Sequence, residues 1–281
     1  MTIADPTRYF IAGMPIAKLP SGVDLQYEAH GAGEPLLLIM GTGLDHRFWS
    51  SQVPAYAEHF HTIVYDARGV GKSTVPADPT TCSMAVMADD AAQLLDALGI
   101  EVAHVSGLNM GSAVAQELCL RHPRRVLSAQ LHGTWGYSDE WLIRMIETLE
   151  EPLRHGELAE FIRYAMMWTA SPTLLEHHKQ TVAEMEASFL AEPPDPVGVL
   201  GHLHASKHHD TRSRLHDIAC PVLVASGEMD AIVPPRYGRE VAERVHSARF
   251  HLILGMQSSH LCCIEMADEF NRFTLDWLRS R

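Results

Sequence analysis

The sequence predicts an α/β fold, in which a mostly parallel central sheet of about eight strands has helices on both faces and an inserted helical cap. Short apolar runs alternate with longer amphipathic segments through both ends of the chain, as in a parallel sheet. Only helical patterns occur between residues 134 and 211. At 281 residues the chain is long enough for one large core with such an insertion. We therefore expect a core of residues 1–133 and 212–281 and a cap of residues 134–211.

The part of the chain before the cap is expected to supply six of the strands. The first two are antiparallel edge strands around Pro20-Ser21-Gly22. In chain order, the six strands are predicted at residues 11–18, 23–30, 36–40, 63–65, 102–106 and 126–132. Helices are predicted at 84–98 and 112–120. Gly99 ends the first of these helices, because glycine adopts the left-handed conformation that commonly terminates a helix.

The remainder of the chain is predicted to form the cap and the last two strands. The cap helices are expected at residues 137–150, 158–168, 173–190 and 197–209. The segment Pro193-Pro194-Asp195-Pro196 separates the last two, because proline cannot continue a helix. Strand patterns then return at residues 221–227 and 250–254.

The segment Gly107-Leu108-Asn109-Met110-Gly111 matches the pattern Gly-x-Ser-x-Gly except at its central residue. It lies between a predicted strand and a predicted helix, where such a turn presents its central side chain above the edge of the sheet. Asparagine tolerates positive φ, so the substitution costs the turn little. Its amide nitrogen is not a nucleophile, because the lone pair is delocalised into the carbonyl group. Asn109 therefore rules out the usual attack by serine.

Four further segments, in collinear order with this turn, resemble the α/β-hydrolase fold superfamily, and within it the cap-bearing bacterial esterases and methylesterases. Gly41-Thr42-Gly43 follows a strand, where that family places half of its oxyanion hole. Residues 66–73 match its Asp-x-Arg-Gly-x-Gly-x-Ser turn. Asp230 follows a later strand at the position of the catalytic acid, and His260 follows the last strand, with Glu265 five residues further on. Residue 109, Asp230 and His260 thus have the nucleophile–acid–histidine order of the fold.

The resemblance implies a role for each of these residues. Asp230 and His260 would form an acid–base dyad, with the carboxylate fixing the tautomer of the imidazole. The backbone N–H groups of Met110 and Thr42 would form an oxyanion hole, which needs no particular side chain. Asp66 and Arg68 are expected to brace their turn and not to contact substrate.

Asn109 leaves three interpretations of the function open. In the first, the enzyme performs non-hydrolytic acid–base chemistry (cyclisation, elimination or rearrangement) on a bulky apolar metabolite, as in secondary metabolism. We favour it, because a retained dyad without a nucleophile indicates a use for the dyad. In the second, the protein is an inactivated Ser→Asn variant of a serine hydrolase of esters, thioesters or lactones. In the third, it is a non-catalytic pseudo-hydrolase that binds a ligand.

The cap is expected to supply the wall of the pocket. Trp135, Met167 and Trp168 are the candidate substrate-binding residues, because a lid over an active site turns some large apolar side chains inward. The cap is also rich in histidine: His177, His178, His202, His204, His208 and His209. The chain has no Cys-x-x-Cys or His-Glu-x-x-His pattern, so we expect neither a metal nor a cofactor.

Composition limits the partners. A formal net charge of −13 argues against nucleic acid and against an anionic membrane surface. No apolar stretch approaches the roughly 20 residues that span a bilayer. The first ten residues lack the apolar core of a secretion signal, and five cysteines without framework spacing fit a reducing cytoplasm. We expect a cytoplasmic enzyme of a small, apolar molecule, with a homodimer left open.

Overall fold

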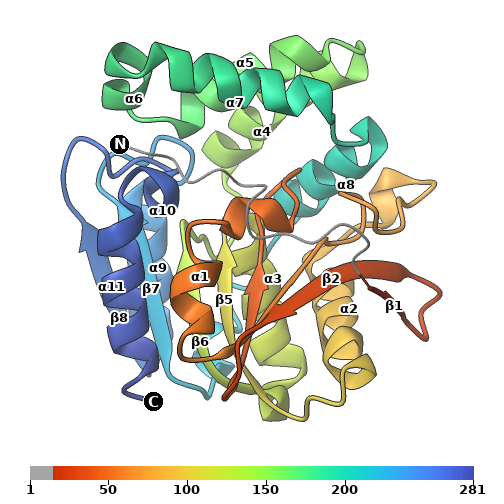
Figure 1. Cartoon of the computed structure of the whole chain (residues 1–281), viewed down its shortest axis with the longest axis vertical. Helices are drawn as coiled ribbons and strands as arrows, with labels where there is room; N and C mark the ends of the chain where they lie inside the picture. The colour runs from red at the N-terminus through yellow and green to blue at the C-terminus, as the bar shows by residue number, and fades with distance from the viewer. Residues whose placement is uncertain (1–14) are drawn as a thin grey trace.

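The computed structural model describes residues 15–281 and has an eight-stranded sheet within that range (Figure 1). The spatial order is β1-β2-β4-β3-β5-β6-β7-β8, with β1 and β2 antiparallel to their neighbours and all other pairs parallel. The strands are β1 (Ile16–Lys18), β2 (Asp24–His30), β3 (Pro35–Ile39), β4 (His61–Tyr65), β5 (Ala103–Leu108), β6 (Val126–His132), β7 (Val222–Gly227) and β8 (Ala248–Ile253). The predicted fold class is confirmed. The beginning of the first expected strand, residues 11–14, lies outside the described residues.

Helices cover both faces of the sheet because the side chains of its central strands alternate between two apolar clusters. In β3, Leu37 and Ile39 belong to one cluster and Leu36 and Leu38 to the other. The first cluster contains residues of α2 (Met84–Ala97), α3 (Met110–Arg121) and α9 (Pro235–Arg244). The second contains residues of α1 (Val53–Ala57), α10 (Cys262–Glu265) and α11 (Ala267–Leu278). Short 3-10 helices lie at His46–Trp49, Pro79–Thr81, Pro123–Arg125 and Leu215–Asp217.

Five consecutive helices lie between β6 and β7 and cover one end of the sheet (Figure 1). They are α4 (Glu140–Arg154), α5 (Leu158–Thr169), α6 (Pro172–His177), α7 (Lys179–Ala191) and α8 (Pro196–Lys207). The single helix expected at residues 173–190 is therefore wrong. The chain leaves helical geometry at His178, with φ −128° and ψ 44°, and this residue separates α6 from α7. We refer to residues 134–211 as the cap.

Helix α8 packs directly against a core loop. A Cβ atom added at Gly198 would lie 1.7 Å from the carbonyl oxygen of Gly69, and one added at Gly69 would lie 2.9 Å from the Cα of Gly198. Gly69 also has a φ of +96°, which other residues rarely adopt. The two backbones therefore approach each other closely, and neither position has space for a side chain.

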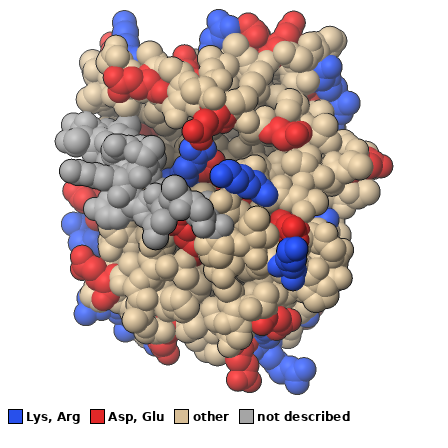
Figure 2. Space-filling view, turned by 45° about the vertical axis from the view of Figure 1, so that its right-hand side comes forward, with Lys and Arg blue, Asp and Glu red and all other residues tan. Residues whose placement is uncertain are grey.

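The surface mixes both signs of charge. On the face shown in Figure 2, acidic and basic side chains lie interspersed over the cap and the core. This mixture accompanies the formal net charge of −13. Among residues 15–281, no helix combines the length and the apolar character that crossing a bilayer requires.

Candidate active site

The turn from β5 to α3 holds Asn109 in a strained conformation. Asn109 has a φ of 53° and a ψ of −123°, and it is the one non-glycine residue with positive φ within residues 15–281. A Cβ atom at Gly107 would lie 2.2 Å from the carbonyl oxygen of Gly111, and one at Gly111 would lie 2.1 Å from that of Ile39. Both glycines are therefore required, and they make the turn tight enough to present residue 109 above the sheet.

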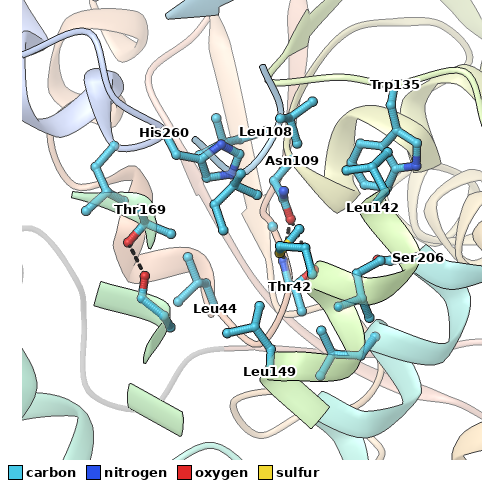
Figure 3. Close-up of a pocket in the computed structure, with 18 of the residues that line it drawn as sticks. Thr42, Leu44, Leu108, Asn109, Trp135, Leu142, Leu149, Thr169, Ser206 and His260 are labelled. Carbon is cyan, nitrogen blue, oxygen red and sulfur yellow. Dashed lines mark hydrogen bonds between the residues drawn. The ribbon is translucent and has the colours of Figure 1, made fainter. Parts of the chain in front are cut away.

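The side chain of Asn109 lies against the loop that follows β3 (Figure 3). Its Oδ1 accepts hydrogen bonds from the backbone N–H of Thr42, at 3.4 Å, and from the hydroxyl of Thr42, at 3.1 Å. The backbone N–H can only donate, so the amide group must direct its oxygen to Thr42 and leave its NH2 group for other partners. The backbone N–H of Thr42, which was expected to stabilise an oxyanion, is thus already bonded to the amide oxygen of Asn109.

His260 and Asp230 form the expected pair. Nδ1 of His260 lies 2.7 Å from Oδ2 of Asp230, and both residues are buried. Oδ1 of Asp230 accepts hydrogen bonds from the backbone N–H groups of Ile232, at 2.9 Å, and Val233, at 2.8 Å. The carboxylate is therefore fixed from both sides, and it accepts the Nδ1–H of the imidazole. This tautomer leaves Nε2 of His260 as the proton acceptor.

Gly133, at the end of β6, provides space for this pair. Its φ is +54°, and a Cβ atom there would lie 3.1 Å from Cε1 of His260 and 3.5 Å from Oδ2 of Asp230. Any larger residue would push on the imidazole. Gly133 is a site residue that the sequence did not identify.

Glu265 joins the cap to the loop that carries His260. Its carboxylate accepts hydrogen bonds from the backbone N–H of Ser171, at 2.9 Å, and from the Ser171 hydroxyl. It also accepts one from the hydroxyl of Ser259, at 2.6 Å. Ser171 is the N-cap of α6, and Ser259 directly precedes His260. A single buried carboxylate therefore connects the position of α6 to the backbone beside the imidazole.

His202 of α8 fixes the loop on the other side of the site. Its Nδ1 accepts a hydrogen bond from the backbone N–H of Gly43, at 3.1 Å, and its Nε2 donates to the carbonyl oxygen of Arg68, at 2.7 Å. The ring is fully buried, and this burial lowers its pKa to about 4. It is therefore neutral near pH 7, as its acceptor role requires.

The buried residues of the Asp66 turn have structural partners. Asp66 accepts hydrogen bonds from the backbone N–H and the ring Nδ1 of His46, at 2.9 and 2.6 Å. Arg68 pairs with Asp90 through two hydrogen bonds of 2.5 and 2.6 Å. Possible ligand atoms of Asp45, His46 and Asp66 lie within 4.8 Å of one another. These carboxylates already bind His46 and Arg47, so the structure explains the group without a metal.

A cavity of about 100 Å³ lies between the cap and the sheet, next to Asn109 and His260 (Figure 3). Its wall is mostly apolar. The lining residues comprise Gly41, Thr42, Leu44, Leu108, Asn109, Trp135, Leu142, Met145, Ile146, Leu149, Phe161, Ala165, Thr169, Leu203, Ser206, Ile232, Val233, His260 and Leu261. Asn109, His260, Thr42 and Trp135 are thus brought together as expected.

Met167 and Trp168 do not line the cavity, which corrects the expectation for these two residues. Their side chains are 67% and 39% exposed. Helix α5 instead turns Phe161, Ala165 and Thr169 inward, at the spacing of four residues that keeps side chains on one helix face. Met167 and Trp168 lie about 100° and 200° around the helix from Met166, which is buried.

Comparisons with known proteins agree with this architecture. Residues 34–257 match a family model described as alpha/beta hydrolase fold. A protein named "Putative carbamate hydrolase RutD" from Azorhizobium caulinodans is 34% identical over 226 residues, which cover 80% of this chain and 84% of the relative. A crystal structure of a hydrolase from Pseudomonas aeruginosa superposes with a TM-score of 0.87 at 28% identity, covering 96% of this chain and 99% of the other.

A second solved structure is an enol-lactonase from Burkholderia xenovorans, with a TM-score of 0.85 at 26% identity. It covers 94% of this chain and 100% of its own. The family match covers well over half of the sequence, and the strand order, the turn at residue 109 and the His260–Asp230 pair fit the same architecture. The chain belongs to the α/β-hydrolase fold family.

Proposed function

We propose that this α/β-hydrolase-fold enzyme transfers a proton to or from a small, mostly apolar carbonyl compound, without a covalent intermediate on residue 109. The observation that carries the proposal is the pair of His260 and Asp230, held at 2.7 Å beside an apolar cavity whose central residue cannot attack. A binding protein would have no need of an oriented imidazole. We therefore assign the His260–Asp230 pair to acid–base chemistry other than hydrolysis.

His260 is the proposed general base. Its Nε2 would remove a proton from the carbon next to the substrate carbonyl, and Asp230 would stabilise the imidazolium that forms. Negative charge would then develop on the carbonyl oxygen. Met110 begins α3, where backbone N–H groups lack intrahelical acceptors, and the NH2 group of Asn109 is a second donor. These two donors would stabilise the enolate, and return of the proton completes the cycle.

The volume of the cavity favours a smaller substrate than the sequence led us to expect. The sequence led us to expect a bulky apolar metabolite, whereas drug-sized ligands occupy pockets of roughly 300–1,000 Å³. A cavity of about 100 Å³ fits a molecule of a few carbon atoms. We therefore propose a small substrate, with the apolar side chains of α4 and α5 covering its carbon skeleton.

Hydrolysis is the second candidate, because relatives carry names such as carbamate hydrolase and enol-lactonase. In this chain it would require His260 to activate a water molecule directly, since residue 109 offers no hydroxyl group. An inactivated serine hydrolase and a ligand-binding pseudo-hydrolase are the remaining alternatives. They differ from both candidates in predicting no turnover by the sequence that carries Asn109.

The test is deuterium exchange. Butanone is incubated with the enzyme in D2O, and loss of its α-proton signals is followed by nuclear magnetic resonance. We expect exchange that His260→Ala abolishes and that Asp230→Asn slows by several orders of magnitude, because the imidazole then adopts the wrong tautomer. Hydrolysis of phenyl acetate or a phenyl carbamate by the natural sequence, without exchange in the ketone, would favour the second candidate. Mass spectrometry that found an acyl group on Asn109 would contradict the proposal.

A further inference from the structure

Ser206 stands out among the polar residues of the cavity wall. It lies on α8, is 3% exposed, and its Oγ has no hydrogen-bond partner in the structure. Figure 3 shows Ser206 on one side of Asn109 and Thr42, with His260 on the other. The cavity therefore has an unpaired hydroxyl group away from the proposed base.

The other hydroxyl groups of the wall already have partners. Thr42 Oγ1 donates to Asn109, and Thr169 Oγ1 donates to the carbonyl oxygen of Ala165, at 2.8 Å. The indole N–H of Trp135 donates to Ser138 Oγ, at 3.0 Å. Among the described lining residues, Ser206 is thus the one whose hydroxyl group has no hydrogen-bond partner.

An unpaired buried hydroxyl is unfavourable. Serine in a helix commonly donates to the carbonyl oxygen four residues earlier, and Ser206 makes no such bond. Leaving a buried donor unsatisfied costs about 1–3 kcal/mol relative to water, so such groups in native proteins call for an explanation. Because Ser206 borders an apolar cavity, a bound molecule is the partner that the site lacks.

We propose that Ser206 is a second recognition group of this site, and that it binds an uncharged hydroxyl or carbonyl oxygen of the substrate. The inference rests on the proposed function in treating the cavity as the substrate site. Among residues 15–281, no lysine or arginine lines the cavity, so we infer that the second group of the substrate carries no negative charge. The substrate is then a small molecule with two oxygen functions joined by an apolar carbon chain. One would be held by the Met110 N–H and the Asn109 NH2 group, and the other by Ser206.

Matched ketones test this role. Hydroxyacetone and butanone differ by replacement of a hydroxyl group with a methyl group, and their longer homologues extend the spacing between the two ends. We would measure the binding of each pair to the full-length protein by ligand-detected nuclear magnetic resonance. At the spacing that reaches Ser206, we expect the hydroxylated member to bind about tenfold more tightly. Ser206→Ala should remove this preference and leave the binding of the plain ketone unchanged.

Thr169→Val is the control, since it removes a hydroxyl of the same wall that is already bonded within its helix. It should keep the preference. Ser206→Ala should also leave the melting temperature unchanged or raise it, and a clear decrease would show a structural role and overturn the inference. Equal binding of the hydroxylated and the plain ketone at every spacing would also overturn the role of Ser206. If the bound ketones still exchanged their α-protons, the proposed function would stand. Binding with the preference but without exchange would contradict the proposed function alone.

Discussion

His202 of the cap accepts a hydrogen bond from the backbone N–H of Gly43, the residue that follows Thr42 in the loop after β3, at 3.1 Å. The second ring nitrogen donates to the carbonyl oxygen of Arg68, at 2.7 Å. The imidazole of His202, a cap residue, is thus hydrogen-bonded to two loops of the core. The position of the Thr42 donor therefore depends on a residue 159 positions away from Gly43 in the sequence.

Replacing His202 should loosen this loop. We expect His202→Ala to lower the free energy of unfolding by about 2–4 kcal/mol, because two buried backbone groups lose their partners and a cavity remains. The amide of Gly43 should exchange with solvent faster, as measured by hydrogen exchange. His204→Ala, on the same helix but with a partly exposed ring, is the control. A Gly43 amide that stayed equally protected would contradict the assigned role.

Stability should fall in mild acid. Burial lowers the pKa of His202 and His209 to about 4 and that of His132 to about 3, from an ordinary value of 6.5. Between pH 6.5 and 4 the unfolded chain binds protons at these positions and the folded protein does not, so the free energy of unfolding decreases as pH falls. Each histidine contributes up to about 1.4 kcal/mol per pH unit in that range.

Urea denaturation at a series of pH values measures this dependence. His202→Gln should reduce the slope by about one proton, because one histidine with a strongly lowered pKa is removed. A slope identical to that of the natural sequence would show that His202 is not protonated on unfolding in this range.

Restoring a nucleophile should convert the chemistry. Asn109→Ser supplies a hydroxyl beside His260, and the turn should accept serine because residue 109 has the positive φ and the closely packed flanking glycines expected of a nucleophile elbow. We expect hydrolysis of phenyl acetate to rise by about 10³-fold or more over the natural sequence, with an acyl-enzyme visible by mass spectrometry. Asn109→Ala, which also vacates the Thr42 donor but has no hydroxyl, should show no such gain.

A methyl group at residue 133 should disturb the dyad. The Cβ atom of Gly133→Ala would lie 3.1 Å from Cε1 of His260, which is tighter than ordinary contact, so the imidazole must shift. We expect the exchange rate to fall by about tenfold, since the imidazole must move by a few tenths of an ångström and an error of about 1 Å lowers a rate by about 10²-fold. Gly156→Ala is a matched control, because Gly156 has a φ of +76° and no atom within 4 Å of the added group. Gly156→Ala should lower stability by a similar amount, because alanine also disfavours positive φ, and it should keep full activity.

The parts of the site that follow strands were predictable from the sequence. Local glycines fix the turn at Asn109, and parallel strands end at the same edge of the sheet, so Asp230 and His260 had to lie near it. The two remain 30 residues apart in the chain, and only the order of the motifs brings them together.

The cap was less predictable, because its contacts depend on how helices dock. The periodicity of α5 did not reveal which face turns inward, and Met167 and Trp168 lie outside the cavity. The contact between Ser171 and Glu265 joins residues 94 positions apart and has no local signal. The break at His178 likewise arises from a single residue within an otherwise helical pattern.

The close approach of Gly69 and Gly198 limits how this enzyme can be recombined with its relatives. A cap transplanted from another protein would place a new residue at position 198, and any side chain there would collide with the carbonyl group of Gly69. A chimaera should fold with its cap seated only if the donor segment also carries glycine at that position. Exchange of specificity by cap swapping is therefore constrained by a pair of residues on opposite sides of the graft boundary.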